Sequence, residues 1–216
     1  MSRLSASRER AVWNGVGAIL VALWFALLNG WKPLVLIISA AAVHECGHWL
    51  LLRLFHVPVT AFHITLFGAE MRTINSSLSY PAEIAAVLAG PGANLLFGAA
   101  LLHLSGVCPF PFSAAAGAHF ALALFNLLPV YPLDGGRLLE LLLSWSISPD
   151  CGVRTAKIAG AASGAGAAAV LLWTVARTGG NLWLLPAAAG LAFFAVRPLR
   201  EAGGKYQEEF RHVMEK

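Results

Sequence analysis

Two histidines and a glutamate stand together inside an apolar stretch of the sequence. The run His44-Glu45-Cys46-Gly47-His48 places the histidines four residues apart. On a helix such residues share a face, so both imidazoles are able to reach one metal ion. Glu45 is turned by about 100° from His44 on such a helix and can approach the metal without being a ligand. Zinc lowers the pKa of bound water to about 7, and a carboxylate base then helps deliver hydroxide to a carbonyl. The pattern predicts one Zn²⁺ ion, held by His44 and His48, with Glu45 as the catalytic base.

The surroundings of this motif favour a functional role. His44, Glu45 and His48 lie in the middle of a run of Leu, Ile and Ala. Ionisable residues inside a membrane span are costly and usually line a functional or water-filled site. The alternative interpretation is a buried polar cluster that joins helices.

A catalytic zinc usually has three protein ligands and one open position, so a third ligand is needed. Among the 11 acidic residues, Asp134 stands out because it follows a stretch interrupted by Pro129 and Pro132 and precedes two glycines. Such a stretch is expected to unwind, which is tolerated at membrane depth only around a polar cavity. A turn at the membrane surface is the alternative explanation of the same residues.

Two asparagines lie in other apolar segments. Asn94 ends the run Gly90-Pro-Gly-Ala-Asn94, and Asn126 precedes the proline-rich stretch. One interpretation is that both amides hydrogen-bond between helices. The other is that they bind the substrate backbone or stabilise a developing oxyanion.

The composition indicates a membrane protein. Of 216 residues, 58% are hydrophobic and 12% are charged, whereas soluble domains are about 25% charged. The formal charge of +4 does not indicate a nucleic-acid partner, because the basic residues lie between apolar runs and more plausibly set membrane orientation. The three cysteines are isolated and support neither a disulfide framework nor a cysteine-based zinc site.

The apolar runs predict an all-α integral membrane protein, with one polytopic domain over residues 1–200 and a short cytosolic tail over 201–216. Six segments approach the roughly 20 apolar residues that a spanning helix needs. They are about 12–29, 33–54, 82–106, 114–143, 153–176 and 181–197. The fourth is expected to end in unwound backbone, because two prolines break it. With the N-terminus inside, only Lys32 and Arg177 of the 15 basic residues fall outside, so both termini are predicted to be cytosolic.

A different pattern separates the second and third segments. Phe62, Ile64 and Leu66 alternate with other residues before Gly68, which predicts a short strand and turn. We expect a small membrane-associated β-hairpin here. It is either a simple connection or a sheet edge onto which an extended peptide adds as a strand.

The three motifs together resemble the site-2 protease family of intramembrane metalloproteases. His44 to His48 match its H-E-x-x-H span, Gly90 to Asn94 match its G-P-x-x-N segment, and Asn126 to Gly135 match N-x-x-P-x-x-P-x-D-G. These matches occur in the family's order and, with the intervening spans, cover most of residues 33–143. The six-span plan looks most like the branch of stage IV sporulation protein FB, which releases a membrane-tethered pro-sigma factor. Members of that branch often carry a CBS domain after the last span, and we expect none here; a PDZ-like insertion is also missing.

This resemblance implies roles for particular residues. His44, His48 and Asp134 would be zinc ligands, and Glu45 the general base. Asn94 and Asn126 would be polar residues of the substrate site, and a strand over residues 62–66 would clamp the substrate.

We therefore expect a zinc metalloendopeptidase of the bacterial cytoplasmic membrane, or of an internal membrane derived from it. Its partners would be a membrane-tethered protein substrate, such as a pro-sigma or other transcription factor, and membrane inhibitors or activators. The expected cut lies beside the membrane and faces the cytosol. The alternatives are a membrane metal-binding or transport protein without protease activity, a non-catalytic membrane binding partner, and a zinc hydrolase that acts on lipid. Transporters commonly have repeated halves, and the sequence contains one H-E-x-x-H motif.

Overall fold

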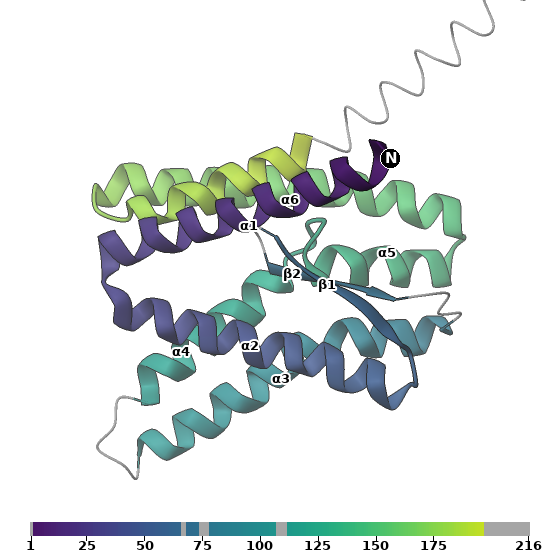
Figure 1. Cartoon of the computed structure of the whole chain (residues 1–216), viewed down its shortest axis with the longest axis horizontal. Helices are drawn as coiled ribbons and strands as arrows, with labels where there is room; N and C mark the ends of the chain where they lie inside the picture. The colour runs from purple at the N-terminus through teal and green to yellow at the C-terminus, as the bar shows by residue number, and fades with distance from the viewer. Residues whose placement is uncertain (1, 66–67, 74–77, 107–111, 197–216) are drawn as a thin grey trace, which may run out of the picture. The chain divides into compact units, whose positions relative to one another are not determined.

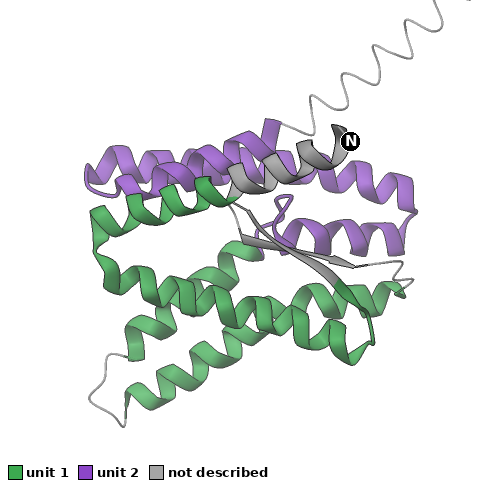
Figure 2. Cartoon of the chain, in the orientation of Figure 1, with its two compact units in different colours: residues 1–126 green, residues 127–216 purple. Residues whose placement is uncertain are grey.

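The computed structural model describes residues 2–65, 68–73, 78–106 and 112–196, and these are mostly helical (Figure 1). The chain divides into two compact units, Met1–Asn126 and Leu127–Lys216 (Figure 2). The expected tail over residues 201–216 lies outside the described residues.

The first unit is a group of helices with one pair of strands. Its helices are listed here in chain order: α1 (Ser2–Asn29), α2 (Trp31–Leu54), α3 (Tyr80–Ser105) and α4 (Phe112–Asn126). Helices α2, α3 and α4 all pack against one another, and α1 packs against α2. A single residue, Gly30, joins α1 to α2 with φ of 85°. That left-handed conformation favours glycine, since it has no Cβ.

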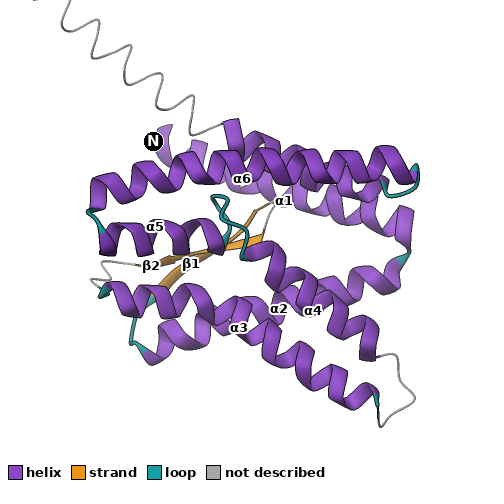
Figure 3. Ribbon diagram, turned by 180° about the vertical axis from the view of Figure 1, so that it is seen from behind, coloured by secondary structure: helices purple, strands orange, loops and turns teal. Residues whose placement is uncertain are grey.

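The two strands lie between α2 and α3 in the chain. Strand β1 (Val59–Thr65) pairs antiparallel with β2 (Gly68–Thr73), and a register shift lies between Val59 and Ala61. The strand expected from the alternating residues lies in this pair, and the expected turn at residues 66 and 67 lies outside the described residues. Figure 3 distinguishes the strands from the helices around them.

Close approach of α2 and α3 depends on glycine. A Cβ at Gly47 would lie 2.5 Å from the Ala89 carbonyl oxygen and 2.8 Å from the Ala93 Cβ. A Cβ at Gly90 would overlap the imidazole of His48. Small residues let helix backbones approach closely in a membrane, where the hydrophobic effect does not drive helices together.

The second unit is built around α6 (Pro149–Thr178). It also contains α5 (Asp134–Ser146), the 3₁₀ turn η1 (Leu182–Leu184) and an apolar helical segment, Leu182–Val196. Helix α6 begins at the Ser148 cap, whose side chain accepts a hydrogen bond from the Cys151 N–H at 3.4 Å. Its end is marked by Gly179, with φ of 63°, as in a common helix C-cap.

Small residues of α6 contact the rest of this unit. A Cβ at Gly160 would lie 3.2 Å from the Pro129 carbonyl oxygen, and one at Gly164 would lie 3.2 Å from the Val130 Cγ1. The loop before α5 therefore lies against these glycines of α6.

Three helices in the described part of the chain are long and apolar enough to cross a membrane, namely α2, α3 and α6. The shorter apolar helices are Gly15–Asn29, Phe112–Asn126 and Leu182–Val196. These helices indicate an integral membrane protein. The expected fourth segment, 114–143, is two helices in the structure and not one element. Helix α4 ends at Asn126, before the prolines, and a helix resumes at Asp134 where unwound backbone was expected.

Candidate metal centre

The histidine pair of α2 converges as the four-residue spacing predicts. The two Nε2 atoms of His44 and His48 lie 3.2 Å apart. Their rings meet edge to face, with centroids 4.8 Å apart and an interplanar angle of 81°. The His44 side chain is buried, and His48 is partly buried. Two nitrogen donors therefore point at one position inside the first unit.

His48 is held from its other side by α3. Its Nδ1 lies 2.8 Å from the carbonyl oxygen of Ala86. A carbonyl can only accept, so Nδ1 carries the proton and the Nε2 of neutral His48 carries a lone pair. A backbone carbonyl on the outer nitrogen is the usual way in which a metal-binding histidine is oriented.

The spacing of the two Nε2 atoms fits a zinc ion. Nitrogen ligands at about 2.0–2.1 Å from a tetrahedral ion lie about 3.3 Å from each other. The observed 3.2 Å matches this value. Imidazole nitrogen is also a preferred donor for zinc, so donor type and geometry agree.

A buried amide connects this pair to a third histidine. Asn94 of α3 is 0% exposed, and its Nδ2 lies 3.3 Å from the His44 Nδ1. Its Oδ1 lies 3.0 Å from the Nδ1 of His119 on α4, which is 1% exposed. The His119 ring also packs against Phe97, with centroids 4.9 Å apart. The first unit thus contains a continuous hydrogen-bonded series from His119 through Asn94 and His44 to His48.

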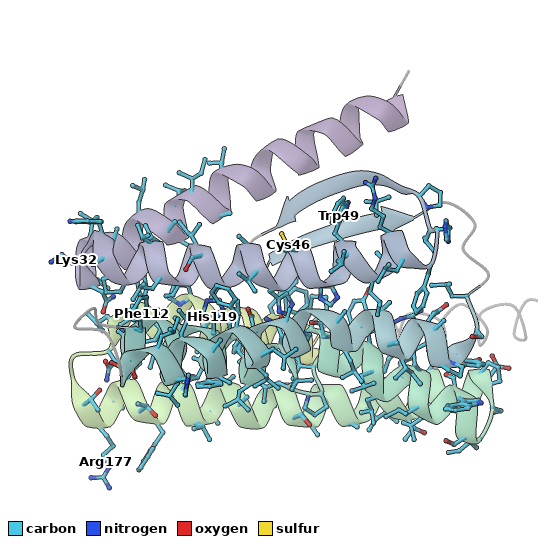
Figure 4. The ribbon with its side chains drawn as sticks, turned by 90° about the horizontal axis from the view of Figure 1, so that it is seen from below. Lys32, Cys46, Trp49, Phe112, His119 and Arg177 are labelled. Atoms are coloured by element: carbon cyan, nitrogen blue, oxygen red, sulfur yellow. The ribbon has the colours of Figure 1, made fainter. Side chains whose placement is uncertain are left out.

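His119 is the residue that sequence reasoning missed. Figure 4 labels it on α4. It lies in the apolar run FSAAAGAHFALALFN. An ionisable group within a membrane segment is costly, and this cost is the signal by which the sequence could have identified His119. No spacing motif includes His119, so its link to Asn94 became visible only when α3 and α4 were packed together.

Glu45 and Cys46 follow His44 on other faces of α2. Glu45 is partly buried and Cys46 is exposed. In Figure 4 the Cys46 sulfur lies on the side of α2 away from α3, so it is turned away from the histidine pair.

Asn126 is the last residue of α4. Its Nδ2 donates to the Leu122 carbonyl oxygen at 3.1 Å, one turn earlier in the same helix. This bond holds the Asn126 side chain against its own helix. The hydrogen bonds described for Asn126 do not link it to the histidine series.

Asp134 opens α5 in the second unit. It lies in the first helical turn after Leu133 and is partly buried, a position where a carboxylate interacts favourably with the helix dipole. The preceding loop is held by turns, with Leu133 N donating to Val130 O at 2.8 Å. A Cβ at Gly135 would overlap the backbone carbonyl of Leu127. The loop and the start of α5 are therefore in direct backbone contact.

The predicted substrate strand is described in part. Phe62 and Ile64 belong to β1 and oppose Met71 and Ala69 of β2. Leu66 lies outside the described residues.

The chain is similar to a peptidase family and to proteins provisionally named zinc metalloproteases. Residues 104–173 match a family model described as peptidase family M50; this stretch includes Asn126 and Asp134. A Synechocystis sp. protein provisionally named a zinc metalloprotease is 30% identical over 57% of this chain and 36% of its own length. Stage IV sporulation protein FB of Bacillus subtilis is 31% identical over 55% of this chain and 43% of its own length. The matches therefore span less than half of these relatives.

The solved structure of the site-2 protease from Methanocaldococcus jannaschii has the same fold. The TM-score is 0.62 at 21% identity, over 85% of this chain and 88% of that chain. Together these comparisons confirm the resemblance to the site-2 protease family that the three motifs indicated.

Proposed function

We infer that this chain, a relative of the M50 peptidases of the site-2 protease type, is an intramembrane zinc metalloprotease. It would hydrolyse peptide bonds of membrane-tethered proteins within or beside the bilayer. The observation that carries this proposal is the histidine pair of α2, whose Nε2 atoms lie 3.2 Å apart within an apolar helix. This spacing also suits two nitrogen ligands of one zinc ion.

We propose His44, His48 and Asp134 as the zinc ligands. They offer two imidazole nitrogens and one carboxylate oxygen, a ligand set that occurs in catalytic zinc sites and leaves the fourth position open. Asp134 is supported by the N-x-x-P-x-x-P-x-D-G motif and by its place in the stretch that matches the M50 model. When bound, zinc supplies a Lewis acid and lowers the pKa of water to about 7.

The chain's own residues would carry the proton transfers. Glu45 takes a proton from the attacking water and passes it to the leaving amine, acting as general base and then as general acid. Asn126, beside the proline-rich loop, is the proposed polar residue of the substrate site. Asn94, also expected there, is fully buried with its amide on His44 and His119, which favours the alternative of a hydrogen bond between helices. An extended substrate would add to the outer edge of the β1–β2 pair at residues 62–66, because backbone hydrogen bonds at a sheet edge hold peptides of varied sequence.

The membrane arrangement is also part of the proposal. Six spans in one polytopic domain over residues 1–200, a tail over 201–216 and both termini in the cytosol would follow from the distribution of basic residues. A bacterial cytoplasmic membrane, or an internal membrane derived from it, would be the location. The substrate would be a tethered protein such as a pro-sigma factor or another transcription factor, cut on the cytosolic side and under the control of membrane inhibitors or activators.

The decisive experiment removes the base and keeps the ligands. Purified Glu45→Gln protein in proteoliposomes should retain the zinc content of the wild type and lose cleavage of a single-span substrate by roughly 100-fold or more. Cys46→Ser is the matched control, because Cys46 is the next residue of α2 and lies on the opposite side from α3. This control should cut at the wild-type rate.

Cleavage by Glu45→Gln at the wild-type rate would contradict the mechanism. Metal uptake into the proteoliposomes without any cleavage by the wild type would instead favour a membrane metal transporter.

A further inference from the structure

The buried hydrogen-bonded series of the first unit assigns a role to His119. We propose that His119 is a positioning residue for the metal ligand His44 and acts through the amide of Asn94. The proposal rests on the metal site proposed above, and it goes further because His119 belongs to none of the three motifs. The evidence is the pair of contacts of the Asn94 amide, 3.3 Å to the His44 Nδ1 and 3.0 Å to the His119 Nδ1.

With all three imidazoles neutral, donor and acceptor rules give the bonds of the series one direction. The Ala86 carbonyl accepts from the His48 Nδ1–H, so neutral His48 has a lone pair on Nε2. If His44 donates to that lone pair from its own Nε2–H, its Nδ1 must accept from the Asn94 Nδ2–H. The Asn94 Oδ1 then accepts from the Nδ1–H of His119. All four bonds point the same way, from His119 toward Ala86.

A metal ion on both Nε2 atoms reverses part of this series. His44 must then carry its proton on Nδ1, because Nε2 offers its lone pair to the metal. That Nδ1–H requires an acceptor, so the Asn94 amide must turn by half a rotation and present its oxygen to His44. The amide Nδ2–H now faces His119, whose Nδ1 must accept and whose proton must therefore lie on Nε2.

His119 suits this role because one nitrogen can donate or accept. The neutral imidazole has two tautomers, and a change between them converts Nδ1 from donor to acceptor. The position is almost fully enclosed, with His119 1% and Asn94 0% exposed, so the amide depends on this partner in place of bulk water. A buried amide without a partner is costly, which makes the orientation of His44 sensitive to His119.

The first test compares two substitutions at one position. His119→Phe keeps an aromatic ring beside Phe97 and removes the hydrogen bond. His119→Asn places an amide near the former Nδ1 position and can donate or accept. His103→Phe is the matched control, because His103 is an exposed histidine of α3. Zinc dissociation constants are measured on the purified full-length proteins by competition with a chromophoric chelator, and thermal unfolding is recorded alongside.

We expect His119→Phe to bind zinc about tenfold more weakly than the wild type, since removal of an outer partner of a metal ligand typically costs 10- to 100-fold. His119→Asn should recover most of this loss, and His103→Phe should match the wild type. Wild-type zinc affinity in folded His119→Phe overturns the proposal. Equal loss in His119→Phe and His119→Asn also overturns it, because it indicates a role in packing alone.

The second test needs no substitution in the measured protein and therefore holds even if His119→Phe does not fold. ¹⁵N NMR of wild-type protein labelled at histidine nitrogens distinguishes protonated from unprotonated ring atoms, and the His119→Asn spectrum identifies the His119 signals. Zinc should move the His119 proton from Nδ1 to Nε2. An unchanged tautomer in a protein that binds zinc overturns this inference and leaves the proposed function standing. A wild type that binds no zinc at the histidine pair overturns both.

Discussion

In the first unit, His44 and His48 stand on the continuous helix α2, whereas in the second unit Asp134 stands at the first residue of α5, directly after a loop with two prolines. Helical periodicity alone brings the two histidines to one face. Asp134 has no such repeat to place it, and its position depends on how the loop over residues 127–133 is folded.

Gly90 of α3 and the two glycines near the start of α5 differ in the kind of atom that lies next to them. Gly90 of α3 leaves room for the His48 imidazole, which is a side chain and can turn. Gly135 and Gly136 of α5 leave room for backbone atoms of the preceding loop, at Leu127 and Val130 among others. Backbone held in turns cannot move aside as a ring can. The comparison teaches that the start of α5 should tolerate added volume less well than α3 does at Gly90.

Gly135→Ala should have the largest effect. Its Cβ would overlap the Leu127 carbonyl group, so either the loop or the start of α5 must shift. Overpacking of this kind costs about 3 kcal/mol, which should appear as a lower unfolding temperature in detergent. The control is Gly166→Ala in α6, where the added Cβ meets nothing within 4 Å; its free energy of unfolding should rise by up to about 1 kcal/mol, because alanine favours helix over glycine. Equal unfolding temperatures for the two variants would show that the loop yields easily.

Gly90→Ala should affect metal binding more than stability. The new methyl group would displace the His48 ring from its bond with the Ala86 carbonyl. We expect zinc affinity to fall by about tenfold or more, whereas the free energy of unfolding falls by about 1–2 kcal/mol. The matched variant is Gly92→Ala, two residues on in α3, where the added Cβ has no atom within 4 Å. Zinc titration of both purified proteins checks this, and equal affinities would mean that His48 binds metal without its present orientation.

The parts of the site that were predictable from sequence are those set by local rules. The four-residue spacing predicted that His44 and His48 converge, and the two prolines predicted a break within the segment 114–143. The cost of ionisable groups in an apolar run identified His44, Glu45 and His48 as functional candidates. These inferences needed only the residues near each position.

The unpredicted parts depend on contacts between helices distant in sequence. The sequence left open whether the Asn94 amide binds substrate or another helix, and the structure places both amide atoms on His44 and His119. This arrangement requires α2, α3 and α4 to pack so that Asn94 lies between His44 and His119. The sequence of no single helix specifies that alignment. The return of helix at Asp134 was likewise missed, because two glycines follow it and glycine disfavours helix. Their role is to admit the loop backbone.

Gly160→Ala should change the free energy of unfolding least. It tests whether the loop before α5 is rigid where it meets α6. This glycine lies in the middle of α6, and its added Cβ would stand 3.2 Å from the Pro129 carbonyl oxygen. Alanine favours helix over glycine by about 1 kcal/mol, and the close oxygen opposes that gain by a similar amount if the loop is rigid. The free energy of unfolding of Gly160→Ala should therefore stay close to that of the wild type. Gly166→Ala in the same helix keeps the whole stabilisation that alanine gives to a helix. Denaturation of both variants in detergent measures the difference, expected at about 1 kcal/mol in favour of Gly166→Ala. If both variants gain equally, the loop moves away from α6 at no cost, and its backbone is rigid where it meets Gly135 and Gly136 but not where it meets Gly160.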